Sequence, residues 1–103
     1  MADHDRRHAA RVALIRDIEY AGDGSRTRRR LTDLGPNGLY IDTTGPLPMG
    51  SELDLKFTLP DDSTVTARGV VRYHQPGVGM GVEFVEISEE DRDRVKRWVE
   101  RLS

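Results

Sequence analysis

Apolar and polar residues alternate with a period of two along most of this chain, and this feature constrains its fold more than any other. The segment 52–59, ELDLKFTL, is the clearest case, because every second residue is leucine or phenylalanine and the residues between are charged or polar. Successive side chains of a strand point to opposite faces. The pattern therefore predicts strands with one face in a core and the other in water.

About six such segments occur, spaced roughly 8–12 residues apart, and turn-forming residues separate them. In the segment 64–73, TVTARGVVRY, the alternation runs from Val65 to Tyr73 and predicts that both side chains share the core face. The turns have the sequences AGDGS (21–25), GPNG (35–38), GPLPMG (45–50), PDDS (60–63) and HQPGVG (74–79). Several short strands joined by turns are typical of an antiparallel barrel or sandwich.

The segment 88–102 follows a helical pattern instead. Ser88 and Asp91 have the spacing of a capping box. Apolar residues then recur at i, i+3, i+4 and i+7, at Val95, Trp98, Val99 and Leu102. Such a helix must pack its apolar stripe against something, either the open end of a barrel or, through Trp98, a second copy of the chain. We predict an all-β fold, a six-stranded antiparallel barrel (12–87) with a C-terminal helix (88–102), in one domain (1–103) that begins with a flexible arm (1–11).

Composition and charge narrow the classes of function. The absence of cysteine excludes disulfides, thiolate metal sites and a cysteine nucleophile. The first 31 residues carry eight arginines against five acids, whereas the whole chain has a net charge of −2. A chain that is basic at one end only suits a small anionic ligand better than DNA or RNA. The charged N-terminus and the lack of a long apolar run predict a cytoplasmic protein that does not insert into membranes.

No group of residues has the pattern of a catalytic or metal site. His4 and His8 could hold a metal only on a helix, and they precede a predicted strand. The glycines of GVGMG (77–81) resemble a dinucleotide loop, but they lead into a strand rather than a helix. We therefore predict that the protein is not an enzyme and holds no metal or cofactor.

Basic residues gather in two places. The segment DRRHAAR (5–11) places Arg6, Arg7 and Arg11 just before the first strand. The second run, RTRRR (26–30), is either a solvated strand face or an electropositive wall beside a ligand groove. The turn that follows, TDLGPNG (32–38), combines Asp33 with two glycines. Taken alone, it is explained by a turn of type I or II with proline at its second position.

Together, these motifs resemble the PilZ domain, the bacterial cyclic di-GMP receptor family. The family carries an Arg-x-x-x-Arg element before its first strand, and Arg7 and Arg11 have that spacing. Its second signature, Asp/Asn-x-Ser-x-x-Gly, is similar to the segment from Asp33 to Gly38, except that Gly35 stands in the place of the serine. The later strands and the closing helix also come in the family's order, and its fold is a six-stranded barrel with a helix at one end.

The resemblance implies a site for cyclic di-GMP. Arg7 and Arg11 would grip guanine edges or phosphates, as bidentate guanidinium groups can. Arg6 would add a contact and favour two ligands per chain, bound as an intercalated dimer. Asp33 would accept hydrogen bonds from the guanine N1–H and amino group. The arm would fold over the ligand and present a new surface to an effector protein.

The glycines decide between two alternatives. Gly38 would let the turn adopt a positive φ and let the ligand approach the backbone, whereas Gly35 removes the serine hydroxyl and weakens the site. The first alternative is a cyclic di-GMP receptor, and the second is a degenerate PilZ-like interaction module that binds no nucleotide. A third class, a barrel that binds single-stranded nucleic acid, would need aromatic residues on the basic strand, and RTRRR has none.

Overall fold

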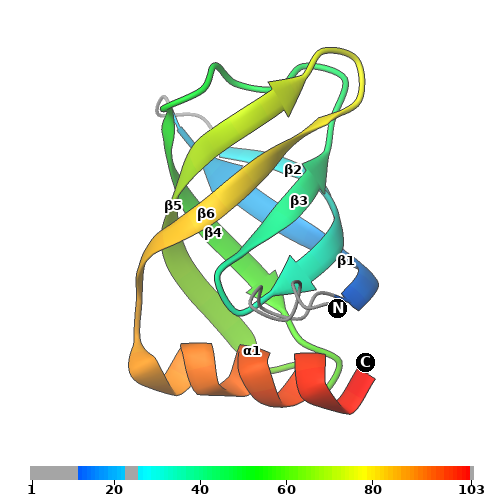
Figure 1. Cartoon of the computed structure of the whole chain (residues 1–103), viewed down its shortest axis with the longest axis vertical. Helices are drawn as coiled ribbons and strands as arrows, with labels where there is room; N and C mark the ends of the chain where they lie inside the picture. Colours follow the sequence, from blue (N-terminus) through cyan, green and yellow to red (C-terminus); the bar gives the residue numbers. More distant parts are fainter. Residues whose placement is uncertain (1–11, 23–25, 103) are drawn as a thin grey trace, which may run out of the picture.

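The chain folds into a closed antiparallel barrel with a helix across one end (Figure 1). This computed structural model describes residues 12–22 and 26–102. The described elements are β1 (Val12–Ala21), β2 (Arg26–Gly35), β3 (Gly38–Asp42), β4 (Glu52–Thr58), β5 (Thr64–Gln75), β6 (Gly79–Ile87) and α1 (Glu89–Leu102). The strands are ordered β1-β2-β3-β6-β5-β4 around the barrel, and β4 pairs with β1 to close it. The predicted all-β fold, a six-stranded antiparallel barrel with a C-terminal helix, is confirmed.

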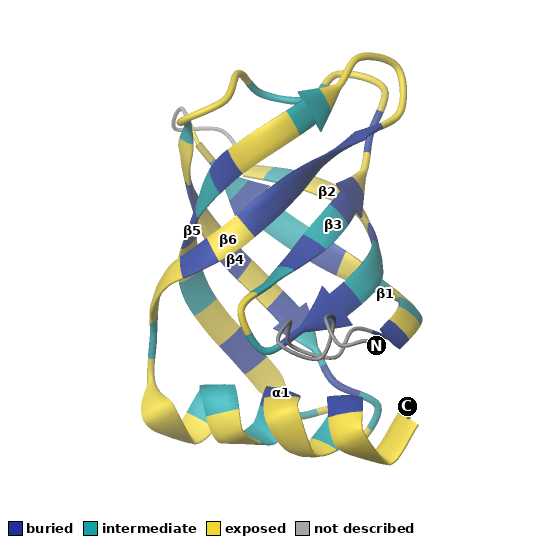
Figure 2. Cartoon of the chain, viewed as in Figure 1, coloured by how far each residue is buried: buried dark blue, intermediate teal, exposed yellow. Residues whose placement is uncertain are grey.

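The barrel interior is filled by the inward-facing residues of all six strands (Figure 2). In β4 the strict alternation holds, and Leu53, Leu55 and Phe57 are almost completely buried. The rings of Phe57 and Phe84 stack across the interior with their centroids 6.3 Å apart. Burial of this apolar surface, at roughly 25 cal/mol per Å², is the main contribution that stabilises the barrel.

Helix α1 closes the lower end of the barrel in Figure 1. Its N-terminus is capped as predicted, because the Asp91 N–H donates a hydrogen bond to Ser88 Oγ at 3.1 Å. Val95 and Val99 are buried against the core. The prediction for Leu102 was wrong, since its side chain is 46% exposed. The last residue of the apolar stripe, Leu102, therefore does not pack in the core as Val95 and Val99 do.

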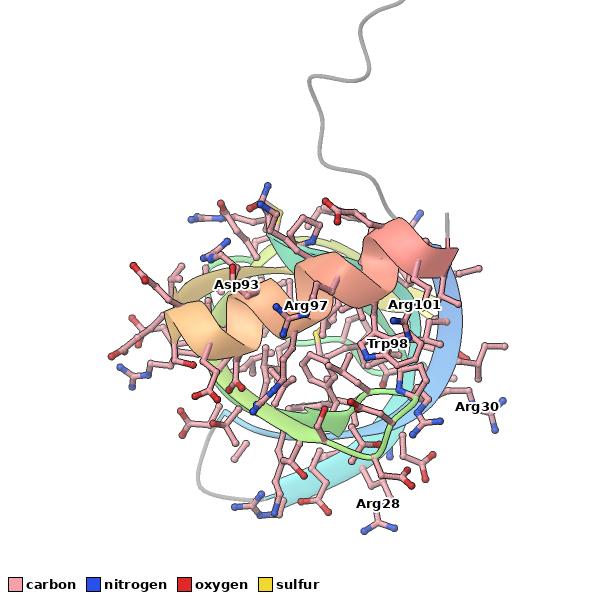
Figure 3. All side chains as sticks on the ribbon, turned by 90° about the horizontal axis from the view of Figure 1, so that it is seen from below. Arg28, Arg30, Asp93, Arg97, Trp98 and Arg101 are labelled. Carbon is pink, nitrogen blue, oxygen red and sulfur yellow. The ribbon has the colours of Figure 1, made fainter. Side chains whose placement is uncertain are left out.

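Trp98, for which the sequence left two positions open, lies half-buried against the core cluster. The Arg101 guanidinium lies over its ring, 4.7 Å from the centroid (Figure 3). The hydrogen bond from the Ser63 hydroxyl is the largest cause that lowers the pKa of Asp61, and the Trp98 side chain is the smallest. The Trp98 side chain therefore packs on the barrel.

Among the described residues, no helix is both long enough and apolar enough to cross a membrane.

The predicted orientation of Tyr73 was wrong, and a β-bulge explains why. The register of β5 with β6 shifts between Val71, which pairs with Val82, and Tyr73, which pairs with Gly81. The additional residue reverses the alternation that follows it. Tyr73 is therefore 47% exposed on the outer face of the barrel.

Candidate ligand-binding site

The β2–β3 hairpin carries the part of the predicted site that the structure describes. Gly35 and Gly38 form the last pair of the hairpin, and the two residues between them make the turn. This turn lies at the end of the barrel that α1 covers (Figure 1). The three predicted arginines, Arg6, Arg7 and Arg11, lie outside the described residues.

A row of paired residues continues from Asp33 across the outer face of the sheet. Asp33 of β2 pairs with Tyr40 of β3, Tyr40 pairs with Gly81 of β6, and Gly81 pairs with Tyr73 of β5. Residues directly opposite one another in an antiparallel ladder point to the same face. The strand pairing therefore brings Asp33 into one outer row with Tyr40 of the same hairpin and with Tyr73, which lies 40 residues later in the sequence.

Two glycines of β6 let these tyrosine rings lie against the backbone. A Cβ atom at Gly79 would collide with the Tyr40 ring, and one at Gly81 would collide with the Tyr73 ring. The ring centroids are 6.1 Å apart and the rings are tilted by 36°. The Tyr40 hydroxyl donates to Gln75 Oε1, and burial raises the pKa of Tyr40. The outcome is an aromatic surface of two tilted rings in the same row as Asp33.

A pocket of about 240 Å³ opens between this surface and the hairpin. Its lining includes Gly38 together with the polar and aromatic side chains of Asn37, Arg72, Tyr73 and Glu83. The Arg72 Nε–H donates to a Glu83 carboxylate oxygen, so the arginine at the rim is paired with an acid. The pocket thus joins one predicted site residue, Gly38, to an exposed aromatic ring and an arginine.

Gly38 has a different role from the one expected. The described glycines with a positive φ are Gly50 and Gly77, so the predicted positive φ at Gly38 was wrong. A Cβ atom at Gly38 would overlap the Val82 carbonyl oxygen of β6. Glycine is therefore required here because the backbones of β3 and β6 approach closely.

Helix α1 also reaches the site through Arg92. Its Nη1 donates to the Pro36 carbonyl oxygen at 3.0 Å and to Asn37 Oδ1 at 3.2 Å. The Phe84 N–H donates to the Asn37 carbonyl oxygen at 2.9 Å. The turn is therefore held from the helix on one side and from β6 on the other.

The first arginines of β2 are largely occupied by a neighbouring acid. Arg26 and Arg28 both bind Glu19 of β1, at 3.1 and 3.0 Å. These interactions lower the pKa of Glu19, with the hydrogen bond from Arg28 as the largest cause. Arg28 and Arg30 point away from the barrel (Figure 3). For Arg26 and Arg28 the arrangement agrees with a solvated strand face rather than an electropositive wall.

A larger hollow of about 460 Å³ lies over β4, β5 and the start of α1. It is less suited to an anion, because acids stand among its cations. Arg68 lies 3.6 Å from Asp54 and 3.9 Å from Glu52. Asp91, also in its lining, binds Arg94 at 2.8 Å. Its size alone therefore does not make it the better candidate.

Several residues of this site could not be recognised from the sequence. Tyr40 and Tyr73 have no signal of their own, because their contact depends on the strand order and on the bulge in β5. Arg72 was part of the alternating segment and was not singled out. Arg92 touches a turn 55 residues earlier in the chain, a separation at which no sequence period applies.

A sequence profile of the PilZ domain matches residues 5–101. This chain therefore belongs to the PilZ domain family. No curated protein sequence matches it.

Solved structures share the fold at low sequence identity. The Bacillus subtilis inhibitor of motility, MotI/DgrA, has a TM-score of 0.85 at 20% identity; the match covers 98% of this chain and 53% of that one. The PilZ domain of Escherichia coli YcgR with c-di-GMP has a TM-score of 0.77 at 16% identity, covering 95% and 92%. The Borreliella burgdorferi PlzA protein in complex with c-di-GMP has a TM-score of 0.62 at 14% identity, covering 96% and 38%.

Proposed function

We propose that this domain is a receptor for cyclic di-GMP and that the ligand lies on the outer face formed by β2, β3, β6 and β5. The observation that carries the proposal is where the arginine arm is attached. Val12 pairs with Leu34, and Ala13 pairs with Asp33. Strand β1, which follows Arg7 and Arg11 in the sequence, therefore begins beside Asp33.

The residues around this face match the chemistry of the ligand. Cyclic di-GMP has two guanine bases and two negatively charged phosphodiesters. Arg7 and Arg11 bind guanine O6 and N7 or the phosphates, and Arg6 adds a contact that favours two ligand molecules. Asp33 accepts from the guanine N1–H and amino group, which adenine cannot match. Tyr73 offers an exposed ring on which a base stacks, a contact worth about 1–3 kcal/mol per base in other proteins.

Binding in this proposal produces a signal rather than a reaction. The arm becomes ordered over the ligand, and ordering a segment costs free energy that its new contacts must offset. The ordered arm presents a new surface to an effector protein. The domain is a receptor or adaptor of the cytoplasm and performs no catalysis.

A titration by calorimetry tests the proposal. We expect the wild-type protein to bind cyclic di-GMP with a Kd in the micromolar range or tighter. Arg7→Ala and Arg11→Ala should each weaken binding by about a hundredfold, because a charged bidentate contact is lost with each. Arg97→Ala, on the exposed side of α1 (Figure 3), is the matched control and should bind normally.

The second candidate is a PilZ-like interaction module that binds no nucleotide, and Gly35 is the observation that favours it. The hydroxyl that the family serine supplies is missing, at a cost of about 0.5–1.5 kcal/mol for one hydrogen bond. In the receptor proposal this weakens binding about tenfold without abolishing it. Silent heats for the wild type, with binding that appears only in Gly35→Ser, would favour the interaction module.

A further inference from the structure

Arg92 determines which way the Asn37 amide faces. A guanidinium group can only donate hydrogen bonds, whereas a side-chain amide has one accepting oxygen and one donating NH2 group. Arg92 Nη1 lies 3.2 Å from Asn37 Oδ1 and also donates to the Pro36 carbonyl oxygen. The oxygen of the amide is thereby committed to Arg92. The NH2 group is left on the other branch of the amide.

Asn37 is also part of the pocket lining. It stands at one edge of the pocket, together with Gly38, Arg72 and Tyr73. Its side chain is exposed, and its backbone carbonyl is held by the Phe84 N–H. A donor at this edge would be within reach of a ligand that occupied the pocket.

We propose that Asn37 is a further ligand-binding residue whose side-chain NH2 donates to an acceptor of the nucleotide, and that Arg92 is the positioning residue that holds the amide in this orientation. The inference rests on the proposed function. The acceptor is a phosphate oxygen or the O6 or N7 atom of guanine, the groups of cyclic di-GMP that can accept a hydrogen bond from an amide.

The position of Arg92 suits this role because its own backbone is fixed. It lies in the first turn of α1, where its N–H donates to the Ser88 carbonyl oxygen at 2.9 Å. Further along the helix, Val95 and Val99 anchor α1 in the core. The turn between the two glycines has no comparable packing of its own, so a guanidinium from a rigid helix restricts its side chain and lowers the cost of ordering it on binding.

The substitution Asn37→Asp separates binding from support of the turn. Aspartate keeps the oxygen that accepts from Arg92, but it lacks the NH2 donor and adds a negative charge beside an anionic ligand. We expect the affinity for cyclic di-GMP, measured by calorimetry, to fall tenfold or more, while the midpoint of urea unfolding is unchanged or higher. Binding within twofold of the wild type would mean that Asn37 serves only as an acceptor for Arg92, and would overturn the inference while the proposed function stands.

Arg92→Ala tests the positioning residue, with Arg97→Ala as the matched control on the same helix. We expect about fivefold weaker binding for Arg92→Ala and no change for Arg97→Ala. NMR of the nucleotide-free protein gives a second readout, in which the Asn37 side-chain NH2 resonances should move towards random-coil positions in Arg92→Ala alone. Unchanged resonances would overturn the positioning role.

A silent titration of the wild type would be a different failure. It would remove the proposed function, and the donor role of Asn37 with it. The NMR comparison of Arg92→Ala with Arg97→Ala needs no nucleotide. Even if the domain binds no cyclic di-GMP, this comparison would show whether Arg92 orients the Asn37 side chain.

Discussion

Two outer faces of this barrel cover the same core but offer different surfaces. Over β3, β6 and the end of β5, Gly79 and Gly81 leave the backbone open to two tyrosine rings. Over β1, β4 and the first residues of β2 and β5, charged side chains pair with one another, as Arg26 and Arg28 do with Glu19. The open face also holds one such pair, Arg72 with Glu83, so the two faces differ in their aromatic rings rather than in free charge. A face with an exposed aromatic ring can accept a flat base, and in the proposed function Arg7 and Arg11 bind the ligand's phosphates or guanine edges.

We expect the largest effect from a substitution at Gly38, where the backbones of β3 and β6 approach most closely. Gly38→Ala places a methyl group against the Val82 carbonyl oxygen. Because the obstacle is backbone, β3 must shift away from β6. We expect the free energy of unfolding in urea to fall by about 1–3 kcal/mol, the usual cost of overpacking, and cyclic di-GMP binding to be lost.

Gly45→Ala is the matched control for this change. Gly45 has no positive φ, and a Cβ atom there would meet nothing within 4 Å. We expect a stability within about 0.5 kcal/mol of the wild type and unchanged affinity. Equal losses of stability in Gly38→Ala and Gly45→Ala would contradict the conclusion that glycine is required only at position 38 of these two.

Tyr73→Ala should have an intermediate effect, and on binding rather than folding. The ring is 47% exposed, so its removal costs little of the core. Loss of one stacked base should raise the Kd for cyclic di-GMP about 5- to 100-fold. Val85→Ala, another exposed apolar residue of the barrel wall, should bind normally. Wild-type affinity in Tyr73→Ala would contradict the assignment of this face.

The paired face should show the smallest effect, and on stability alone. The pKa of Glu19 lies below its ordinary value of 4.5, chiefly because Arg28 donates a hydrogen bond to it. A lowered pKa in the folded state means that the stabilisation is complete above the ordinary pKa and is lost as the pH falls through the lowered value. The small difference in unfolding free energy between wild type and Glu19→Gln should therefore shrink below about pH 4.5. A difference in unfolding free energy that does not change with pH would contradict the pairing of Glu19 with Arg26 and Arg28. The affinity of Glu19→Gln for the nucleotide should equal that of the wild type.

The sequence predicted the barrel because its strongest signals are local. The alternation in β4 places Leu53 and Leu55 in the core, and the capping box marks the start of α1 where Ser88 Oγ accepts a hydrogen bond. Both patterns depend only on residues close in the sequence. They can therefore be recognised without knowledge of the strand order.

The site was less predictable because it depends on contacts between distant segments. Asp33 was found through its motif, but the residues that share its row come from three other strands. Tyr73 was expected in the core because the alternation of apolar residues continues to it. A bulge of one residue in β5 turns its side chain to the outer face without altering the composition of the strand. Arg92 looked like one of several charged residues on an amphipathic helix until the fold placed it at the β2–β3 turn.

An amide chemical-shift map of the protein during titration with cyclic di-GMP tests the difference between the two faces most directly. We expect the shifts to concentrate at residues 33–40 and 79–83 and around Tyr73. Residues 52–58 and 64–68 of the paired face should change little. Shifts gathered on 52–58 and 64–68, or no shifts at saturating nucleotide, would contradict this expectation.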